Sequence, residues 1–390
     1  MPFTVLHDQV TMIDYSKIPS PCYLLEESLL RRNLELMNDV QERAGISIIL
    51  AFKGFAMWSA FPLVRQYLKG ATASSLSEAR LCFEEMKTKS HTYAVAYRDQ
   101  EFDEIMALSS HITFNSLSQY ERFKGKVVAY PEKISCGIRV NPEYSEVTTD
   151  LYNPSSPTSR LGMTAAHFGD KLPEGIEGLH FHVLCESTSF TLENTLTAFE
   201  EKFGHLIRKV KWVNMGGGHL MTKKGYDTTH LVSILKAFRE KWGVEVILEP
   251  GSAVAWETGD LVSTVLDVVE NSGVKTAILD ASFTCHMPDC LEMPYKPRIR
   301  GAKMDPEKGK PTYRMGGMSC LAGDYMSEYS FDKELEPGDL IVFEDMIHYT
   351  MVKTTTFNGV PHPSIGIWKE DNSFQLVREF GYEDYKNRLS

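Results

Sequence analysis

The chain has 390 residues, 43% of them hydrophobic and 24% charged, which is typical of a folded protein long enough for a large domain and a smaller one. A formal net charge of −11 without a long basic run argues against a nucleic-acid partner, and no apolar run approaches the roughly 20 residues of a membrane-spanning helix. Residues 1–15 lack the pattern of a secretion signal and the seven cysteines include no CxxC pair, so we expect a cytoplasmic protein.

The first 25 residues read as an extended segment with the run Cys22–Leu25. Short apolar runs then alternate with amphipathic segments of helical spacing such as Leu76–Met86, Thr191–Phe203 and Thr228–Trp242. Eight strand–helix units over about 210 residues predict a (β/α)8 barrel, although a doubly wound open sheet has the same periodicity. The expected strands are Ile48–Phe52, Ala71–Ala73, Thr92–Ala96, Ile112–Phe114, Cys136–Val140, Gly178–Val183, Trp212–Met215 and Val244–Leu248.

Beyond about residue 255 the pattern changes to strands separated by Gly, Pro and Asp turns. We therefore expect a barrel over residues 26–255 and a mostly β domain over residues 256–390, which the extended segment 1–25 joins as a further strand. The expected C-terminal strands are Leu261–Val269, Lys275–Leu279, Leu340–Phe343, Thr350–Phe357 and Phe374–Phe380.

Four unusual features fall at the ends of predicted barrel strands, where barrel enzymes carry their functional groups. Lys53 ends the first strand and His182 lies near the end of the sixth. The run Gly216–Gly218 follows the seventh strand, and Glu249-Pro250-Gly251 follows the eighth. Their common placement indicates a site at the mouth of the barrel.

Each feature has a chemical and a structural interpretation. A desolvated lysine such as Lys53 has a lowered pKa and can form a Schiff base, but a strand-end lysine can also simply reach solvent. Gly216–Gly218 could present backbone N–H groups to a phosphate or be an ordinary turn. Glu249 could keep a pyridine nitrogen protonated or cap a helix. His180 and His182 point to one face of their strand, with His182 nearer the mouth.

The β domain adds two polar segments. In the first, Cys320 is followed four residues later by Asp324, a pairing that could supply a proton donor and an amine-binding carboxylate, although a free cysteine is more often a buried apolar residue. The second combines acids with cysteine and histidine, but it has no second ligand pair, so we expect no metal there. Its residues are Asp280, Cys285, His286, Asp289, Cys290 and Glu292.

Taken in order, these motifs resemble the fold-type III pyridoxal-phosphate decarboxylases, the group that contains ornithine and diaminopimelate decarboxylases. The likeness runs from Pro21-Cys22-Tyr23-Leu24-Leu25 to the C-terminal β segment. It implies pyridoxal 5'-phosphate as the cofactor and a homodimer with active sites at the interface. Lys53 matches the cofactor lysine and Cys320 the catalytic cysteine. The other cofactor contacts implied are His182, Gly216, Gly217, Gly218, Glu249, Gly251 and Tyr349, and the implied substrate-binding acids are Asp280, Asp324 and Glu186.

Within that group the sequence looks most similar to decarboxylases of carboxynorspermidine and carboxyspermidine. The segments Leu179–Glu186, Ser282–Asp289 and Gly316–Asp324 carry this likeness. It implies decarboxylation to norspermidine or spermidine in polyamine biosynthesis. Two residues depart from the ornithine pattern: Ser252 stands where an arginine that binds phosphate is usual, and Leu321 where an aspartate is usual.

Two alternatives stay open at this point. The chain could act on ornithine, arginine or diaminopimelate, or be a racemase, although no motif marks the second base that a racemase needs. It could also be a non-catalytic relative that regulates by binding a partner, but such a protein could dispense with Lys53, Glu249 or Cys320, and all three are present.

Overall fold

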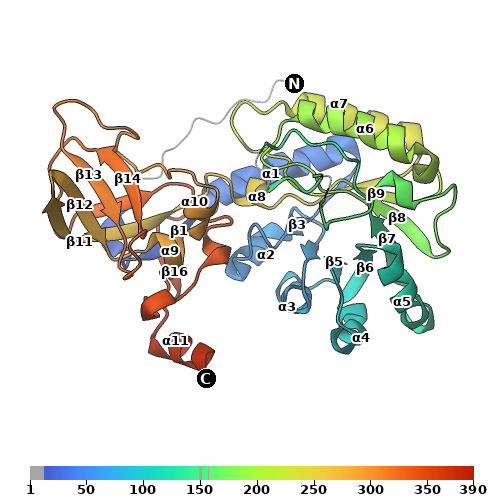
Figure 1. Cartoon of the computed structure of the whole chain (residues 1–390), viewed down its shortest axis with the longest axis horizontal. Helices are drawn as coiled ribbons and strands as arrows, with labels where there is room; N and C mark the ends of the chain where they lie inside the picture. The colour runs from blue at the N-terminus through green and yellow to red at the C-terminus, as the bar shows by residue number, and fades with distance from the viewer. Residues whose placement is uncertain (1–12, 149–151, 157) are drawn as a thin grey trace. The chain divides into compact units, whose positions relative to one another are not determined.

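The computed structural model describes residues 13–148, 152–156 and 158–390, which form two units (Figure 1). One unit comprises residues 31–256, and the other combines the chain up to residue 30 with residues 257–390. The first 12 residues of the expected segment 1–25 lie outside the described part of the chain. Within the described ranges, no helix is both long and apolar enough to cross a membrane.

The unit of residues 31–256 is a barrel of parallel strands. β2 and β3 are two parts of one broken strand, and the sheet closes because β2 pairs with β10 while β3 pairs with β4. The predicted (β/α)8 barrel is therefore confirmed, and the open sheet was the wrong alternative. The strands are β2 (Ser47–Ile48), β3 (Leu50–Ala51), β4 (Ala71–Ala73), β5 (Ser90–Tyr93), β6 (Ser109–Phe114), β7 (Ser135–Arg139), β8 (Ile176–His180), β9 (Trp212–Asn214) and β10 (Glu245–Leu248).

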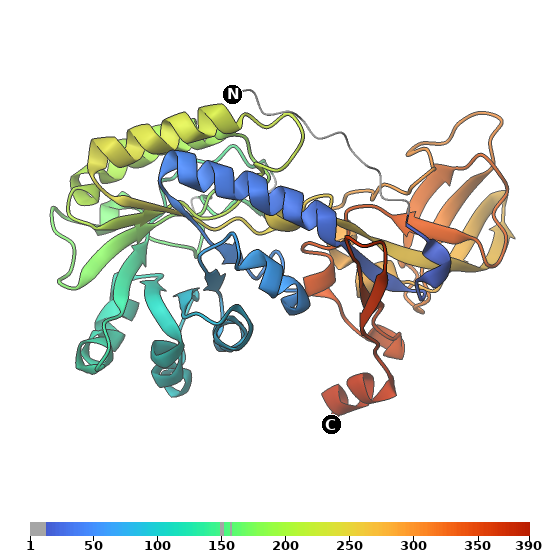
Figure 2. The same ribbon diagram turned by 180° about the vertical axis from the view of Figure 1, so that it is seen from behind.

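Helices follow most of these strands, and α6 and α7 lie side by side (Figure 2). Their starts are set by local capping: Ser116 accepts the N–H of Gln119 at 3.2 Å, and Asp227 accepts the N–H of His230 at 2.8 Å. The helices are α1 (Glu27–Ala44), η2 (Trp58–Ala60), α2 (Phe61–Val64), α3 (Leu76–Leu81), the π-helical η3 (Cys82–Met86), α4 (Asp99–Leu108), α5 (Leu117–Ala129), η5 (Ala165–His167), α6 (Ser189–Ile207), α7 (Thr228–Trp242) and α8 (Ser252–Ala255).

One large side chain is buried among the barrel strands. The indole ring of Trp212 packs with Ile49 and Ile247 and donates its N–H to the Ser135 hydroxyl at 2.9 Å. The ring lies directly over Gly137 and Gly178, which are paired residues of β7 and β8. A β-carbon at either glycine would overlap the indole, so these strands need glycine to admit the ring.

We expect Gly178→Ala to destabilise the protein by about 1–3 kcal/mol, because the added methyl group overpacks a filled interior. Gly125→Ala is the matched control: Gly125 lies in α5 with nothing near its missing side chain, and alanine there should stabilise by about 0.5–1 kcal/mol. Urea unfolding of both variants measures the two effects. A Gly178 variant as stable as the natural protein would contradict the packing argument.

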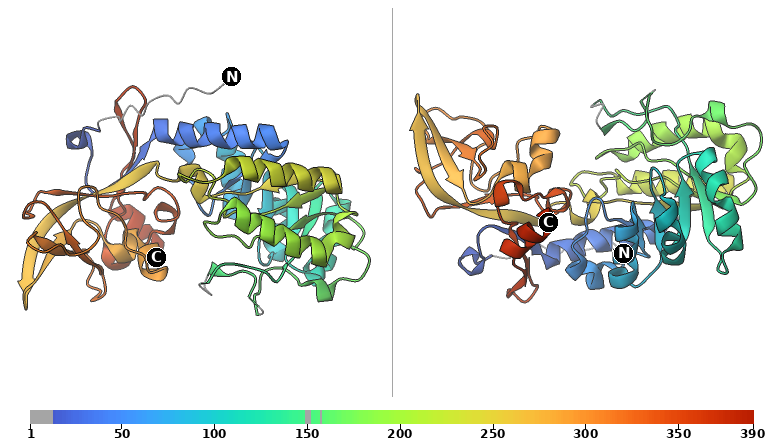
Figure 3. Two further views of the ribbon diagram at one scale, coloured as in Figure 1. Left: turned by 90° about the horizontal axis from the view of Figure 1, so that it is seen from above. Right: turned by 60° about the horizontal axis from the view of Figure 1, so that its bottom comes forward.

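The other unit is built around a mixed sheet in which β11 is the long gold strand of Figure 3. β1 pairs with β11 and β16, so the N-terminal strand joins this sheet. Cys22, Leu24, Val262 and Trp368 belong to one buried hydrophobic cluster of this unit. Its elements are η1 (Tyr15–Lys17), β1 (Cys22–Glu26), β11 (Gly259–Asn271), β12 (Val274–Leu279), α9 (Phe283–His286), α10 (Pro288–Glu292), β13 (Thr312–Gly316), β14 (Tyr325–Ser330), β15 (Leu340–Phe343), η6 (Met351–Lys353), η7 (Phe357–Gly359), β16 (Ser364–Trp368), β17 (Phe374–Arg378) and α11 (Tyr382–Leu389).

The strand predicted at Thr350–Phe357 was wrong. This stretch contains the helical turn η6, in which Tyr349 accepts the N–H groups of Val352 and Lys353 at 3.1 Å each. Thr350 turns its hydroxyl inward to the buried Asp289, at 2.9 Å, instead of alternating with its neighbours as in a strand. The β-branched composition that favoured a strand is overridden by this tertiary contact.

Candidate active site

Lys53 lies in a tight turn just after β3. The N–H groups of Gly54 and Phe55 both donate to the carbonyl of Ala51, at 3.0 and 3.2 Å. The backbone of Gly54 runs against that of Gly251, leaving no room for a side chain at residue 54. Because Gly251 has no side chain, the turn that carries Lys53 can lie against the backbone just after β10.

The Lys53 amine and the His182 ring meet, with Nζ 3.2 Å from Nε2. Gly217 donates its N–H to Nδ1 of His182 at 2.7 Å, so the proton of the neutral ring is assigned to Nε2. Burial lowers the pKa of His182 well below its usual value, and the Lys53 and Arg139 charges add to this. His182 is therefore a neutral ring whose Nε2–H points at the lysine.

The lowered pKa of Lys53 is consistent with this contact. Solvent reaches the side chain, but the surrounding barrel wall lowers the pKa of Lys53 by desolvation, and the charge of Arg139 lowers it further. A neutral amine can accept a hydrogen bond from Nε2–H of His182, whereas an ammonium group would place a second donor against it. The lowered pKa makes the neutral amine, the form that attacks an aldehyde, easier to reach.

Glu249 is a buried carboxylate, only 7% exposed, just after β10. Asn214, the last residue of β9, donates its amide N–H to Oε1 at 2.6 Å, and Nε2 of the buried His180 lies 3.5 Å from Oε2. Burial raises the pKa of Glu249, while the Asn214 hydrogen bond and the Lys53 charge oppose this. Such a group can hold or share a proton with a cofactor ring.

The Gly216–Gly218 run is shaped by the chain around it. Gly216 and Gly218 have φ values of 69° and 88°, which disfavour other residues. β-carbons here would overlap the backbone of Phe181, Leu184 and Glu249. The glycines thus let the loop after β9 lie tightly between the ends of β8 and β10, at the place where a phosphate was predicted.

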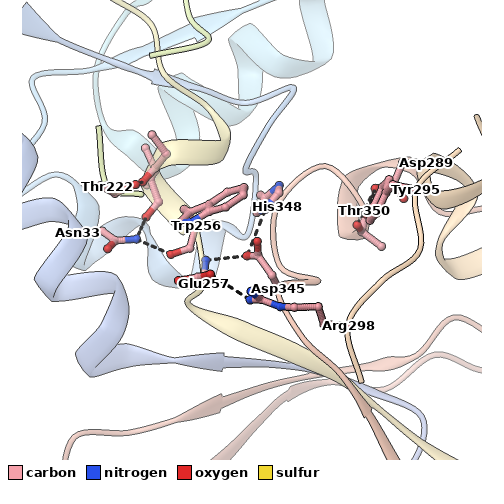
Figure 4. Close-up of polar contacts among 12 residues, drawn as sticks. Asn33, Thr222, Trp256, Glu257, Asp289, Tyr295, Arg298, Asp345, His348 and Thr350 are labelled. Atoms are coloured by element: carbon pink, nitrogen blue, oxygen red, sulfur yellow. Dashed lines mark hydrogen bonds and ion pairs between the residues drawn. The ribbon is translucent and has the colours of Figure 1, made fainter. Parts of the chain in front are cut away.

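Ser252, which replaces the arginine of the ornithine pattern, is buried at the start of α8. Asn33 of α1 donates its amide to the carbonyls of Val254 and Trp256, at 3.3 and 2.8 Å, and fixes the end of this short helix (Figure 4). Thr222 donates to the carbonyl of Ala253 at 2.6 Å. The segment after Glu249 is therefore held in place by side chains of the barrel unit.

Sequence reasoning missed Arg139 as a site residue. It is the buried last residue of β7, with its guanidinium 4.7 Å from the ring centre of Tyr93, and it donates to the carbonyl of His182 at 3.2 Å. Its charge contributes to the lowered pKa of both Lys53 and His182. The available signal was an arginine at the carboxyl end of an apolar run, the same signal that identified Lys53.

Glu186 lies in the loop after β8, exposed and with a φ of 45°. This left-handed conformation is uncommon for glutamate. The neighbouring Ser187 donates its N–H to the carbonyl of Gly218 at 2.8 Å, so the loop is tied to the glycine run. The structure thus brings Glu186 to the loop cluster that includes His182 and Gly217.

In the β unit, Cys320 is exposed and its N–H donates to Oδ1 of Asn358 at 2.8 Å. The two acids predicted to bind an amine are already engaged. Asp280 accepts hydrogen bonds from Ser20, Ser263 and Thr264 at 2.6 to 2.9 Å. Asp324 also accepts three, from Ser282, Thr284 and Ser319 at 2.8 to 3.0 Å, and is 4% exposed.

Tyr349, half-buried with a φ of 37°, follows a segment fixed by ion pairs (Figure 4). Asp345 accepts the N–H of Glu257 at 2.6 Å and lies 3.2 Å from Nε2 of His348. Arg298 pairs with Glu257 at 3.0 Å. These contacts determine where the residues just before Tyr349 lie.

Asp289 is a third acid of the β unit and is 7% exposed. Its Oδ2 accepts hydrogen bonds from Tyr295 and Thr350 at 2.8 and 2.9 Å (Figure 4). Its Oδ1 is buried and has no hydrogen-bond partner among the described residues. Within the same residues, no three of the His, Cys, Asp and Glu side chains are grouped to hold a metal ion.

A family model described as "Pyridoxal-dependent decarboxylase, C-terminal sheet domain" matches residues 22–347. The chain belongs to this decarboxylase family. A solved carboxynorspermidine decarboxylase from Campylobacter jejuni, complexed with norspermidine, has a TM-score of 0.89 and 46% identity and covers 95% of this chain and 100% of its own. A diaminopimelate decarboxylase from Helicobacter pylori, at 18% identity with a TM-score of 0.81, shares the fold over 96% of this chain and 98% of its own.

Among curated relatives, the carboxyaminopropylagmatine decarboxylase of Synechocystis is 51% identical over 96% of both chains. The carboxynorspermidine/carboxyspermidine decarboxylase of C. jejuni is 47% identical over 96% of this chain and 99% of its own. The predicted family, enzyme class and cofactor are thus confirmed. The side chains of this pyridoxal-phosphate decarboxylase fit the cofactor, since a lysine with a lowered pKa, a neutral imidazole ring and a buried carboxylate lie at one barrel mouth.

Proposed function

We propose that this decarboxylase converts carboxynorspermidine and carboxyspermidine to norspermidine and spermidine in polyamine biosynthesis. The observation that carries the proposal is the 47% identity, over nearly the whole of both chains, to the C. jejuni enzyme that bears these substrate names. A 37% identical relative from Herminiimonas arsenicoxydans carries the same name. The C. jejuni structure that contains norspermidine, the expected product, supports the same substrate class.

Carboxyaminopropylagmatine is a second candidate substrate. It is favoured by the 51% identity to the Synechocystis enzyme. The two substrate classes share the reacting end, with an amine and a carboxylate on one carbon, and differ at the far end. There the polyamines carry an ammonium group and the agmatine derivative a planar guanidinium, which prefers bidentate contacts with carboxylates.

The barrel residues supply three functions in this proposal. Lys53 would hold the cofactor through its aldehyde. His182 would pack against the cofactor ring, and Glu249 would keep the ring nitrogen protonated. Bound pyridoxal phosphate itself supplies the electron-accepting ring that makes loss of CO2 feasible. The glycine run and Tyr349 hold its phosphate.

We further propose a cytoplasmic homodimer in which Cys320 of one subunit protonates the carbon that lost CO2 in the barrel of the other. The thiol is exposed, as a general acid that must reach a substrate has to be. All seven cysteines are free, which suits a reducing compartment. The exposed Glu186 and the unpaired oxygen of Asp289 are candidate partners for the distal cation, alongside the sequence-based candidates Asp280 and Asp324.

The test is product formation by the purified, cofactor-loaded enzyme. The substrates are carboxynorspermidine, carboxyspermidine, carboxyaminopropylagmatine, L-ornithine, L-arginine and meso-diaminopimelate at matched concentrations. We expect norspermidine and spermidine as the dominant products, within about 200-fold of each other in kcat/KM, because one methylene contributes only about 1–3 kcal/mol. Preferred turnover of the agmatine derivative would favour the second candidate, and turnover of only a small amino acid would contradict both.

A further inference from the structure

The loop between β13 and β14, residues 317–324, carries Cys320 on its exposed part. The two ends of the loop are tied together, because Gly317 donates its N–H to the carbonyl of Asp324 at 2.7 Å. Asp324 in turn donates its N–H to the carbonyl of Leu321 at 3.0 Å. Cys320 therefore belongs to a short loop that is closed by hydrogen bonds between its two ends, and the geometry of the loop depends on how these ends are held.

The carboxylate of Asp324 holds the ends of this loop in place. Its Oδ2 accepts the hydroxyl of Ser282 at 2.8 Å and the N–H of Ser319 at 3.0 Å, while Oδ1 accepts the N–H of Thr284 at 3.0 Å. Ser319 is the residue directly before Cys320. One carboxylate thus joins the cysteine loop to the start of helix α9 by two hydrogen bonds, and a third holds the residue before Cys320.

The surroundings of Asp324 are dry and closely packed. Ser282 and His286 are fully buried, and the N–H of Ser282 donates to Nδ1 of His286 at 3.1 Å. A β-carbon on Gly317 would overlap the carboxylate of Asp324, so a glycine is required there. Hydrogen bonds to a charged acceptor in such a place are stronger than neutral ones, and leaving a donor unmatched is costly.

We propose that Asp324 is a positioning residue for Cys320: its buried carboxylate fixes the loop that presents the thiol. This inference rests on the proposed function, in which Cys320 donates a proton. It assigns Asp324 a role different from the predicted one as a ligand of the distal ammonium. An ammonium group at Asp324 would compete with three protein donors at a carboxylate that is 4% exposed.

Asp324→Asn is the diagnostic substitution. The amide keeps the size of the side chain, but it offers a donor where the carboxylate has its second acceptor. In one orientation the new NH2 faces the N–H of Ser319, and in the other it faces the N–H of Thr284. The hydroxyl of Ser282 can rotate, but one backbone N–H is always left without an acceptor, so the loop loosens.

The experiment is a double-mutant cycle on the cofactor-loaded enzyme with carboxynorspermidine, using Asp324→Asn, Cys320→Ala and the double variant. If Asp324 acts through the thiol, Asp324→Asn lowers kcat by about 10–100-fold with KM within about threefold. In the Cys320→Ala background it then adds less than about threefold, because the positioned group is gone. A purely structural defect would instead lower kcat equally in both backgrounds.

An amine ligand gives the opposite pattern, and that result would overturn the inference: KM rises more than about tenfold and the two substitutions multiply. Full kcat in Cys320→Ala would also overturn it, and would remove Cys320 from the proposed function without affecting the substrate assignment. Asp332→Asn is the matched control, an exposed carboxylate of the same unit that should leave kcat and KM unchanged.

Two further measurements keep the test decisive. If Asp324→Asn does not fold, Ser282→Ala keeps the charge and removes one of the three hydrogen bonds, together with the hydroxyl that caps α9 at the N–H of Cys285. It should lower kcat severalfold without raising KM, and unchanged kcat would count against the inference. Hydrogen exchange at the amides of Ser319 and Thr284 needs no substrate. Faster exchange in Asp324→Asn than in Asp332→Asn is expected whatever the substrate is, and equal exchange would refute the anchoring.

Discussion

Replacing Lys53 with alanine is expected to abolish turnover, with kcat reduced by at least about a thousandfold. The reason is the loss of the Lys53 amine beside His182, which the variant removes without disturbing the backbone contact between Gly54 and Gly251. The visible absorbance of the lysine-bound cofactor should disappear as well, so the spectrum and kcat are recorded on the same sample.

Lys236→Ala is the control for this experiment, because Lys236 is an exposed residue of helix α7. It should keep both the absorbance and the activity. Retained turnover in Lys53→Ala would contradict the assignment of the cofactor lysine, even if the cofactor remained bound through other contacts.

Replacing Glu249 with glutamine is expected to lower kcat by about 10²–10³-fold while the cofactor stays attached to Lys53. Glutamine can still accept the Asn214 amide at Oε1, so the geometry of the site is kept and the charge facing the cofactor is lost. The ring nitrogen of the cofactor would then have no carboxylate partner. The ring would stabilise the electron pair left by loss of CO2 less well.

Glu245→Gln is the matched control, since Glu245 is the exposed first residue of the same strand, β10. Single-turnover measurements separate a slower chemical step from weaker cofactor binding. If Glu249→Gln turned over as fast as the natural enzyme with a full complement of cofactor, the carboxylate would have no electronic role.

The barrel and its site could largely be predicted from the sequence, because strand ends in a parallel barrel converge on one mouth. Lys53, His182 and Glu249 are 67 to 196 positions apart in the sequence, and yet their common placement follows from the alternation of strands and helices. Arg139 follows the same rule, because it too is a charged residue at the carboxyl end of an apolar strand.

The roles of the acids in the β unit could not be predicted from the sequence. A pattern shows that a carboxylate is present, but not that Ser282 and Thr284, about 40 positions away, supply donors to Asp324. Strands β13, β14 and β16 were also missed, since polar residues and glycine, such as Arg314, Glu328 and Gly366, interrupt their short apolar patterns. Long-range pairing determines both outcomes.

The indole of Trp212 has a consequence for how this barrel can change over evolutionary time. Because the ring occupies the space above Gly137 and Gly178, these three positions cannot vary independently. A smaller residue at position 212 would create a void that side chains at the two glycines could refill, so changes that are harmful singly become compatible together. Relatives that lost the tryptophan should carry larger residues at the other two positions. The substitution of Trp212 must come first, because a side chain at either glycine does not fit while the indole is present.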